Sequence, residues 1–179
     1  MATQGPYYTN TVTDIAGVGP NWQNPSNARL SDDSRSIVSM TFGGLDSHAL
    51  QATDFQFTIP LASTIDGITV EIEKRYVGVG VQDRSVKLIK NGVVVGSEKA
   101  SGSAWGAADA FVSYGGATDL WGETWSVADI NASNFGVQLI AFAITSGTSD
   151  GEVDSFRITI TYTAPTVTPR SMAPSLLGA

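Results

Sequence analysis

Two extended segments near the end of the chain constrain its fold more than any other feature. In the first, alternate residues share one apolar side, namely Phe135, Val137, Leu139, Ala141 and Ala143. In the second, Phe156, Ile158, Ile160 and Tyr162 alternate with Arg157, Thr159 and Thr161. Side chains in a β-strand have a period of two, so both runs predict strands. The polar turn at 146–151 predicts that they form a hairpin, which is stable only if the rest of the chain covers its apolar face.

Shorter segments show the same period. They predict strands around 37–42, 54–59, 68–76, 86–88, 93–95 and 111–114. Within 68–76, the side carrying Ile68, Val70 and Ile72 should be buried, and the side carrying Glu71 and Glu73 should be exposed. Asn91-Gly92 between two apolar runs predicts a two-residue hairpin turn, because that turn needs a positive φ at both positions. A capping box at 126–129 opens the one helical turn that we expect.

Many short strands, with turns between them and almost no helix, indicate an all-β protein with a single antiparallel β-sandwich of jelly-roll type. At 179 residues the chain is long enough for one such domain. We expect an N-terminal arm at 1–20, the sandwich at 21–163 and a Pro-spaced C-terminal arm at 164–179. The arms lack a periodic pattern but carry apolar residues that a solvated tail does not need. We therefore expect four arm residues to contact another subunit: Tyr7, Tyr8, Leu176 and Leu177.

The composition argues against several classes of function. The net charge is −7, whereas nucleic-acid binding needs clustered Lys and Arg to neutralise phosphates, so no nucleic-acid partner is expected. The chain has no Cys, which excludes disulfides, thiolate zinc sites and cysteine nucleophiles. We find no signal-peptide pattern and no apolar run near the roughly 20 residues of a membrane helix, so we expect synthesis in the cytoplasm and no membrane partner. Charged residues make up only 15%, which favours a surface partly covered by partner subunits.

We expect no catalytic residue, no metal and no cofactor. His48 is the only histidine and has no nucleophile-elbow motif beside it, which favours a surface or turn position. Two acidic groups, at 32–33 and 150–154, could supply the carboxylate pair of a glycoside hydrolase, but turns normally collect acids. Asp150, Glu152 and Asp154 occupy alternate positions and could line a calcium site. They lack the EF-hand pattern, and a polar turn is the simpler interpretation.

Five aromatic residues lie in one part of the chain: Trp105, Phe111, Tyr114, Trp121 and Trp125. Carbohydrate-binding sandwiches stack sugar rings on exposed Trp and Tyr side chains. Trp121 and Trp125 flank Gly122 and precede the predicted helical turn, and we expect them to pack in the core. Trp105 and Tyr114 are the residues expected to be exposed, and they are the candidate glycan contacts.

Several short motifs follow one another in a set order between residues 20 and 163. They are Trp22-Gln-Asn-Pro25, Phe57-Thr-Ile-Pro60, Ile65-Asp-Gly67-Ile-Thr-Val70-Glu-Ile72, Leu120-Trp-Gly122, Trp125, Asp129-Ile-Asn131, Asn134-Phe-Gly-Val137, Val153-Asp154 and Ile158-Thr-Ile-Thr-Tyr162. Together they resemble a β-sandwich module of tailed-bacteriophage structural proteins and related prophage proteins. The resemblance implies a virion component without catalytic residues, and neither arm belongs to the recurring pattern.

The leading hypothesis is a non-enzymatic capsid decoration, or cement, protein located in the virion. Its expected partners are the major capsid protein or other virion subunits, and a homo-oligomer is expected. A tail, baseplate or fibre protein is the alternative within this class, although a fibre would normally add a repetitive shaft or coiled coil. A carbohydrate-binding module that recognises host surface glycans is the alternative from another class.

Overall fold

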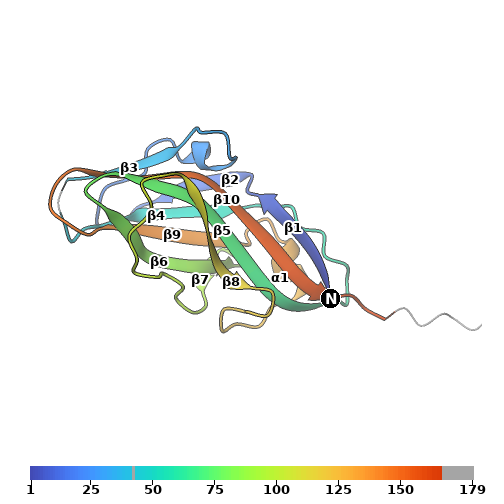
Figure 1. The fold of residues 1–179 in the computed structure, drawn as a ribbon. Helices are drawn as coiled ribbons and strands as arrows, with labels where there is room; N and C mark the ends of the chain where they lie inside the picture. The colour runs from blue at the N-terminus through green and yellow to red at the C-terminus, as the bar shows by residue number, and fades with distance from the viewer. Residues whose placement is uncertain (42, 167–179) are drawn as a thin grey trace, which may run out of the picture.

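The protein consists of two β-sheets packed together (Figure 1). The computed structural model describes residues 1–41 and 43–166. Their strands are β1 (Ala2–Tyr8), β2 (Thr11–Ile15), β3 (Ser36–Met40), β4 (Asp46–Thr53), β5 (Thr64–Gly78), β6 (Val81–Lys90), β7 (Val93–Val95), β8 (Ala110–Gly116), β9 (Gly136–Ala143) and β10 (Ser149–Thr163). A 3₁₀ turn, η1 (Pro25–Ala28), and a short helix, α1 (Val127–Asn131), accompany them. The expected all-β sandwich is confirmed.

Strand β10 is central to the first sheet, whose order is β1-β10-β5-β8. One side of β10 pairs with β5 along its whole length. Its other side pairs first with β3 and then with β1. Because these pairings are antiparallel, Ala2 lies opposite Tyr162, and Figure 1 shows the N-terminus beside the end of β10. The first and last strands of the fold are therefore neighbours.

The second sheet has the order β2-β4-β9-β6-β7. Strands β3 to β6 alternate between the two sheets, so each connection crosses from one layer to the other. The order β4-β9-β6-β7 opposite β3-β10-β5-β8 is that of a jelly roll, with β1 and β2 as additional strands. The predicted jelly-roll type is thus confirmed.

Strands β9 and β10 belong to different sheets, so the predicted hairpin between them is wrong. Their apolar faces are nevertheless buried as expected, and both lie in one core. The fully buried members include Val137, Leu139, Ala141, Phe156, Ile158 and Ile160. Period-two patterns predict which face of a strand is buried, but they do not decide between pairing in one sheet and facing across a sandwich. The polar turn at 146–148 therefore connects two layers.

The register predicted for β5 is correct, since Val70 is fully buried. Glu71 and Glu73 are half-buried rather than exposed. The reason is that β10 covers them with hydrogen-bond donors, namely the guanidinium of Arg157 on Glu71 and the hydroxyl of Ser155 on Glu73. Cross-strand pairs of this kind are a normal way to satisfy charged groups on a sheet.

Two local predictions are confirmed. Asn91 and Gly92 have φ values of 52° and 78°, so both central residues of the β6–β7 turn are left-handed, as a type I′ hairpin requires. The helix α1 begins at a capping box, in which the Ser126 hydroxyl accepts from the backbone N–H of Asp129 and the Asp129 carboxylate accepts from the backbone N–H of Ser126.

The N-terminal segment is not an arm outside the sandwich, so that prediction is wrong for residues 2–15. Strand β1 pairs with β10 in one sheet, and β2 pairs with β4 in the other. Each adds an edge strand, and the pairing of β1 shifts its register between Gln4 and Tyr7, around Pro6, which cannot donate to the ladder. The expected C-terminal arm lies outside the described residues from 167 onward, and so do Leu176 and Leu177.

The strand predicted at 54–59 is also wrong, although Phe55, Phe57 and Ile59 are buried as that pattern requires. Asp54 and Gln56 have positive φ values of 63° and 58°, which are incompatible with a regular ladder. The strand in this region is β4, just before it. Thr53 is its one β-branched residue and it has no Phe, Tyr or Trp, so its strand propensity is low, and its neighbours β2 and β9 hold it in the sheet from both sides.

Candidate functional site

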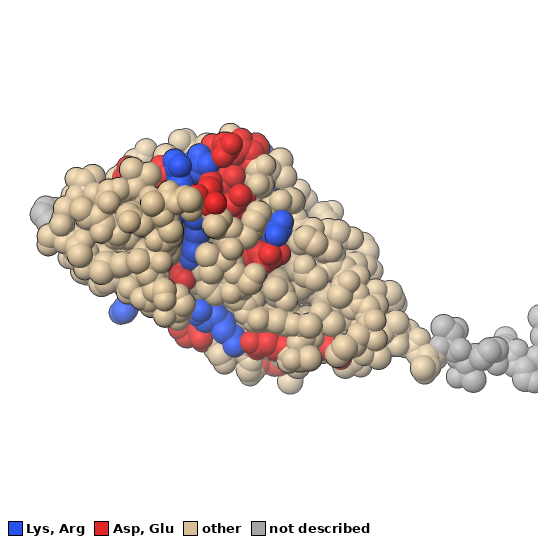
Figure 2. All heavy atoms as spheres, in the orientation of Figure 1, with Lys and Arg blue, Asp and Glu red and all other residues tan. Residues whose placement is uncertain are grey.

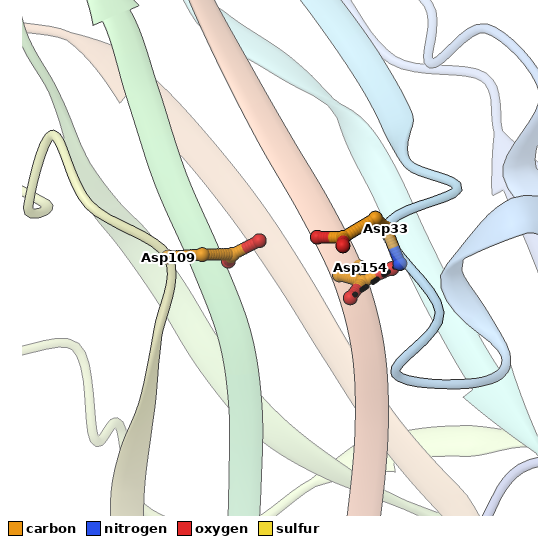
Figure 3. A group of neighbouring side chains, drawn as sticks. All are labelled: Asp33, Asp109 and Asp154. Carbon is orange, nitrogen blue, oxygen red and sulfur yellow. Dashed lines mark hydrogen bonds between the residues drawn. The ribbon is translucent and has the colours of Figure 1, made fainter.

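Three aspartates from distant parts of the chain lie together at one site, which we name the acidic cluster (Figure 3). Asp33 comes from the turn before β3, Asp109 directly precedes β8, and Asp154 lies in β10. One carboxylate oxygen from each lies within 4.8 Å of the others. In the space-filling view, acidic and basic side chains form one group at the upper edge of the molecule, near β3, and another along the lower edge, while much of the visible surface carries neither (Figure 2).

A β-bulge brings Asp154 to this site. In the pairing of β10 with β5, Val153 lies opposite Lys74 and Ser155 lies opposite Glu73, so Asp154 is the extra residue. Bulges re-aim a side chain at the point where they interrupt the ladder. The turn before β3 completes the contact, because the backbone N–H of Asp33 donates to Asp154 Oδ2 at 3.2 Å, and Asp33 itself has a φ of 67°.

Arg35 supplies the positive charge at the acidic cluster. Its Nε and Nη2 donate to Asp109 Oδ2, and Nη2 also donates to Asp33 Oδ1. Burial alone would lower the pKa of Arg35, but the hydrogen bonds from Arg35 to Asp109 and Asp33 and the charges of Asp109 and Asp154 outweigh it and raise that pKa. Arg35 is therefore a fixed cation. The neighbouring Glu152 carboxylate lies 3.8 Å from Arg35 Nε, and its closer partner is Arg75, whose Nε donates to Glu152 Oε2 at 2.7 Å.

The carboxylates of the acidic cluster are incompletely partnered. Asp109 Oδ1 and Asp154 Oδ1 are buried and have no hydrogen-bond partner within residues 1–41 and 43–166. Asp154 is only 2% exposed. Burial, together with the charge of nearby Glu73, raises the pKa of the Asp154 carboxyl despite the hydrogen bond from Asp33. The site therefore holds more negative charge than its surroundings stabilise.

A second polar group, which we name the inter-sheet cluster, lies between the two layers. Lys74 of β5 and Tyr114 of β8 face Asp83 of β6 from the opposite sheet, and Trp105 approaches from the loop before β8. Lys74 Nζ donates to Asp83 Oδ1 and to the Tyr114 hydroxyl oxygen. Trp105 Nε1 donates to Asp83 Oδ1 and the Tyr114 hydroxyl donates to Asp83 Oδ2, each at 2.8 Å. All four residues are buried.

The inter-sheet cluster is charge-balanced, and each of its polar side-chain atoms has a hydrogen-bond partner. Burial lowers the pKa of Lys74, although Asp83 opposes this effect. Burial and the adjacent Asp83 carboxylate raise the pKa of Tyr114, so its hydroxyl stays protonated and donates. The ammonium of Lys74 also lies 4.7 Å from the ring centre of Trp105, within cation–π range. A pocket of about 200 Å³ borders this cluster.

Two predictions about aromatic exposure fail here. Trp105 and Tyr114 were expected to be exposed, but they are only 4% and 5% exposed. Both side chains lie between the two sheets and donate hydrogen bonds to Asp83. Their rings are therefore not free to stack on a sugar. Trp121 is fully buried and Trp125 is half-buried against the core, as expected.

A surface or turn position was expected for His48, but the residue is not in a turn and its side chain is partly buried. It lies in β4, and its Nδ1 is 2.9 Å from Asp14 Oδ2 on the neighbouring strand β2. Trp22 completes the arrangement, since its Nε1 donates to the His48 carbonyl and its backbone N–H donates to Asp14 Oδ1. These contacts fix the β2 edge strand and the segment that follows it.

The acidic residues are grouped differently from the prediction. Asp154 joins the acidic cluster, whereas Asp150 and Glu152 do not. Asp33 comes from the other acidic group considered, so the two groups that looked separate in sequence meet at the bulge. Asp109 was missed, because a single Asp after a run of small residues gives no pattern.

The predicted contact residues of the N-terminal segment line an open groove of about 380 Å³ on β1. Its lining is Pro6, Tyr7, Tyr8, Asn10, Phe55 and Gln56. Tyr7 is 39% exposed, and its ring stacks on that of Phe57 with centroids 5.3 Å apart. The groove thus presents partly exposed aromatic surface.

No protein-family model matches this chain, and no curated protein matches its sequence. None of the helices within the described ranges has the length and apolar character needed to cross a membrane.

Proposed function

We propose that this chain is a non-enzymatic structural subunit of a tailed-bacteriophage particle. The positions of the motif residues support this proposal. Trp22, Phe57 and Trp121, which belong to the motifs resembling the virion module, are all buried in the core. The resemblance therefore concerns the framework of the sandwich. The sole histidine, His48, is engaged with Asp14 and holds two strands together, which fits a structural role.

Within the particle, the proposed role is capsid decoration, in which the subunit binds the major capsid protein and its own neighbouring copies. The observation that carries this role is the groove lined by Tyr7 and Tyr8. Exposed aromatic surface in a concave site is typical of protein interfaces. The low proportion of charged residues, 15%, is consistent with a surface that partners cover.

The proposed occupant of the groove is the C-terminal segment, 164–179, of a neighbouring copy. In sequence this segment is Pro-spaced and ends in two leucines before Gly-Ala. An extended segment of this length reaches about 50 Å, at roughly 3.1 Å per residue. Residue 162 lies opposite Ala2, at the far end of β1 from Tyr7 and Tyr8, so the chain's own segment would have to reverse direction to reach the groove. A neighbour's segment needs no such reversal.

Purified particles test the virion assignment. The chain should co-purify with intact particles at a fixed ratio to the major capsid protein, as measured by mass spectrometry after density-gradient separation. Heads separated from tails should retain it. Recovery with the tails would move the protein to the tail or baseplate, and recovery only in the particle-free lysate would overturn the proposal.

Deleting 164–179 tests the role of the segment. The truncated protein should melt within about 2 °C of the full chain, because the sandwich keeps its core. It should bind decoration-free capsids more weakly in a pelleting assay. A truncated protein that melts far lower but binds capsids normally would place the segment in the sandwich instead.

Disulfide trapping tests the groove directly, because the chain has no native Cys. Asn10→Cys marks the groove and Leu177→Cys marks the segment. Mixing the two single variants under oxidising conditions should give a cross-linked heterodimer faster than either variant alone gives a homodimer. Val93→Cys, at an exposed position outside the groove, is the matched control for Asn10→Cys. Cross-linking of Leu177→Cys to both positions at the same rate would contradict the groove assignment.

A carbohydrate-binding module is not retained as a second candidate. Its proposed contacts, Trp105 and Tyr114, are both buried.

A further inference from the structure

The acidic cluster contains two oxygen atoms whose environment calls for a ligand. Buried polar atoms in proteins almost always have a hydrogen-bond partner, and an exception needs a specific explanation such as a bound ion. Asp154 Oδ1 and Asp109 Oδ1 are two of the four such exceptions within the described residues, and the other two, Asp150 Oδ1 and Ser63 Oγ, lie outside the cluster. Because Asp154 is only 2% exposed, bulk water does not replace the missing partner.

The charge at the acidic cluster leads to the same conclusion. Asp33, Asp109 and Asp154 carry three negative charges, and Arg35 supplies one positive charge. Two negative charges remain, which one divalent cation would neutralise. Arg35 binds Asp109 Oδ2 and Asp33 Oδ1, so it does not occupy the two unpartnered oxygens.

The spacing of the carboxylates suits calcium. Two oxygens bound to one calcium ion at 2.3–2.6 Å are at most about 5.2 Å apart. One carboxylate oxygen from each of Asp33, Asp109 and Asp154 lies within 4.8 Å of the other two. Calcium also accepts irregular sets of six to eight oxygens, including water, whereas magnesium needs a compact and nearly octahedral set.

We propose that the acidic cluster binds one calcium ion through Asp33, Asp109 and Asp154. Water molecules complete the coordination on the outer side, where the Asp33 side chain is 86% exposed and leaves a route for the ion. The three ligands come from the turn before β3, the loop before β8 and the bulge of β10 (Figure 3). The ion therefore fastens two surface loops to the central strand of the first sheet.

Calcium titration of the full chain tests this proposal. Protein treated with EDTA and dialysed should bind CaCl₂ at a 1:1 ratio in isothermal titration calorimetry, with a Kd of about 10⁻⁴–10⁻³ M, as for sites with few protein ligands. At about 10 mM CaCl₂ the melting temperature should rise by roughly 3–10 °C. MgCl₂ at the same ionic strength should raise it by less than half as much.

Matched variants assign the ligands. Asp154→Asn and Asp109→Asn should each weaken calcium binding at least tenfold. Asp150→Asn should bind like wild type, because it removes the same charge from the same strand at a position outside the cluster. Circular dichroism checks that each variant is folded, and Asp109→Asn decides the result if Asp154→Asn does not fold.

Three results would overturn the proposal. One is the absence of both a calcium-binding heat and a melting shift in the folded wild type. Another is equal loss of binding in Asp150→Asn and in the cluster variants. The third is an equal response to calcium and magnesium that persists in Asp154→Asn and Asp109→Asn, since this would show general screening of surface charge.

Discussion

The inter-sheet cluster and the acidic cluster each place a buried carboxylate near a single cation, Asp83 in the first and Asp154 in the second, yet they differ in how completely the carboxylates are partnered. In the inter-sheet cluster, one carboxylate, Asp83, meets one ammonium and two further donors. In the acidic cluster, three carboxylates share one guanidinium, and two oxygens have no partner among the described residues. The first group is complete without a ligand, whereas the second is not.

This difference separates a structural role from a binding role. A fully hydrogen-bonded ion pair in the core is costly to break and holds its partners in one arrangement. Lys74 and Asp83 lie in opposite sheets, so their pairing fixes the two layers relative to each other. An under-partnered group of like charges costs stability until a ligand neutralises it. The predictions below test this contrast.

Removing the Asp83 carboxylate should have the largest effect. Asp83→Ala leaves the Lys74 ammonium buried without its counter-charge, and it should lower the free energy of unfolding by about 3–5 kcal/mol. Urea denaturation followed by fluorescence measures this change. The double variant Lys74→Met with Asp83→Ala should be less destabilised than the sum of the two single variants. Additive effects would show that the pair is not coupled.

Removing the Tyr114 hydroxyl should have an intermediate effect. Tyr114→Phe leaves Asp83 Oδ2 without its donor and should lower the free energy of unfolding by about 1–3 kcal/mol, as measured by urea denaturation.

The pKa of Tyr114 is raised above its ordinary value of 10.0 in the fold. The unfolded chain therefore releases this proton at lower pH than the folded chain, so wild-type stability should fall as the pH rises above about 10. Between about pH 8 and pH 11, the free energy of unfolding measured by urea denaturation should fall less in Tyr114→Phe than in wild type. An equal fall in both proteins would contradict the assignment of this pH dependence to Tyr114.

Neutralising a buried carboxylate of the acidic cluster should change the stability in the opposite direction. In calcium-free buffer, Asp154→Asn should raise the free energy of unfolding by about 1 kcal/mol, the size of one satisfied hydrogen bond. The amide keeps an acceptor for the Asp33 N–H, removes a buried negative charge and offers a donor to the neighbouring carboxylates. Urea denaturation in EGTA measures the change. Destabilisation comparable to that of Asp83→Ala would mean that the two clusters do not differ as argued.

Salt should produce the smallest effect. Raising NaCl from about 0.05 to 0.5 M screens repulsion among the carboxylates of the acidic cluster, and should stabilise calcium-free wild type by a few tenths of a kcal/mol more than Asp154→Asn. Comparing the two proteins cancels effects of salt on the rest of the molecule. An identical salt response would indicate that the cluster carries no net repulsion.

The sequence predicts the strands whose large apolar side chains alternate, and it predicts the local turn chemistry at Asn91-Gly92. It does not predict β4, which has almost no β-branched residue and is held in the sheet by strands on both sides. Neither does it predict β1 and β2, because edge strands need no continuous apolar face. The pattern also does not identify the partner of each strand. β9 and β10 were expected to pair because they follow one another in the sequence, whereas they lie in different sheets.

The two clusters show a similar limit. Lys74 lies on the buried side of the β5 pattern, in line with Val70 and Ile72, and a charge in that position is a signal that a buried partner must exist. Its partner, Asp83, could not be named from the pattern alone. The acidic cluster depends on the extra residue of a bulge, and bulges leave no periodic mark in a sequence.

The position of β10 has a mechanical consequence. The chain leaves the sandwich after Thr163, at the end of a strand that is hydrogen-bonded on both sides. Hydrogen bonds of an antiparallel ladder run perpendicular to the strands. A pull along the axis of β10 would therefore load the bonds to β5 simultaneously, in shear, and would not peel them away one at a time as it would at an edge strand. A tether that begins at this point can transmit force to the sandwich without opening the sheet from its rim.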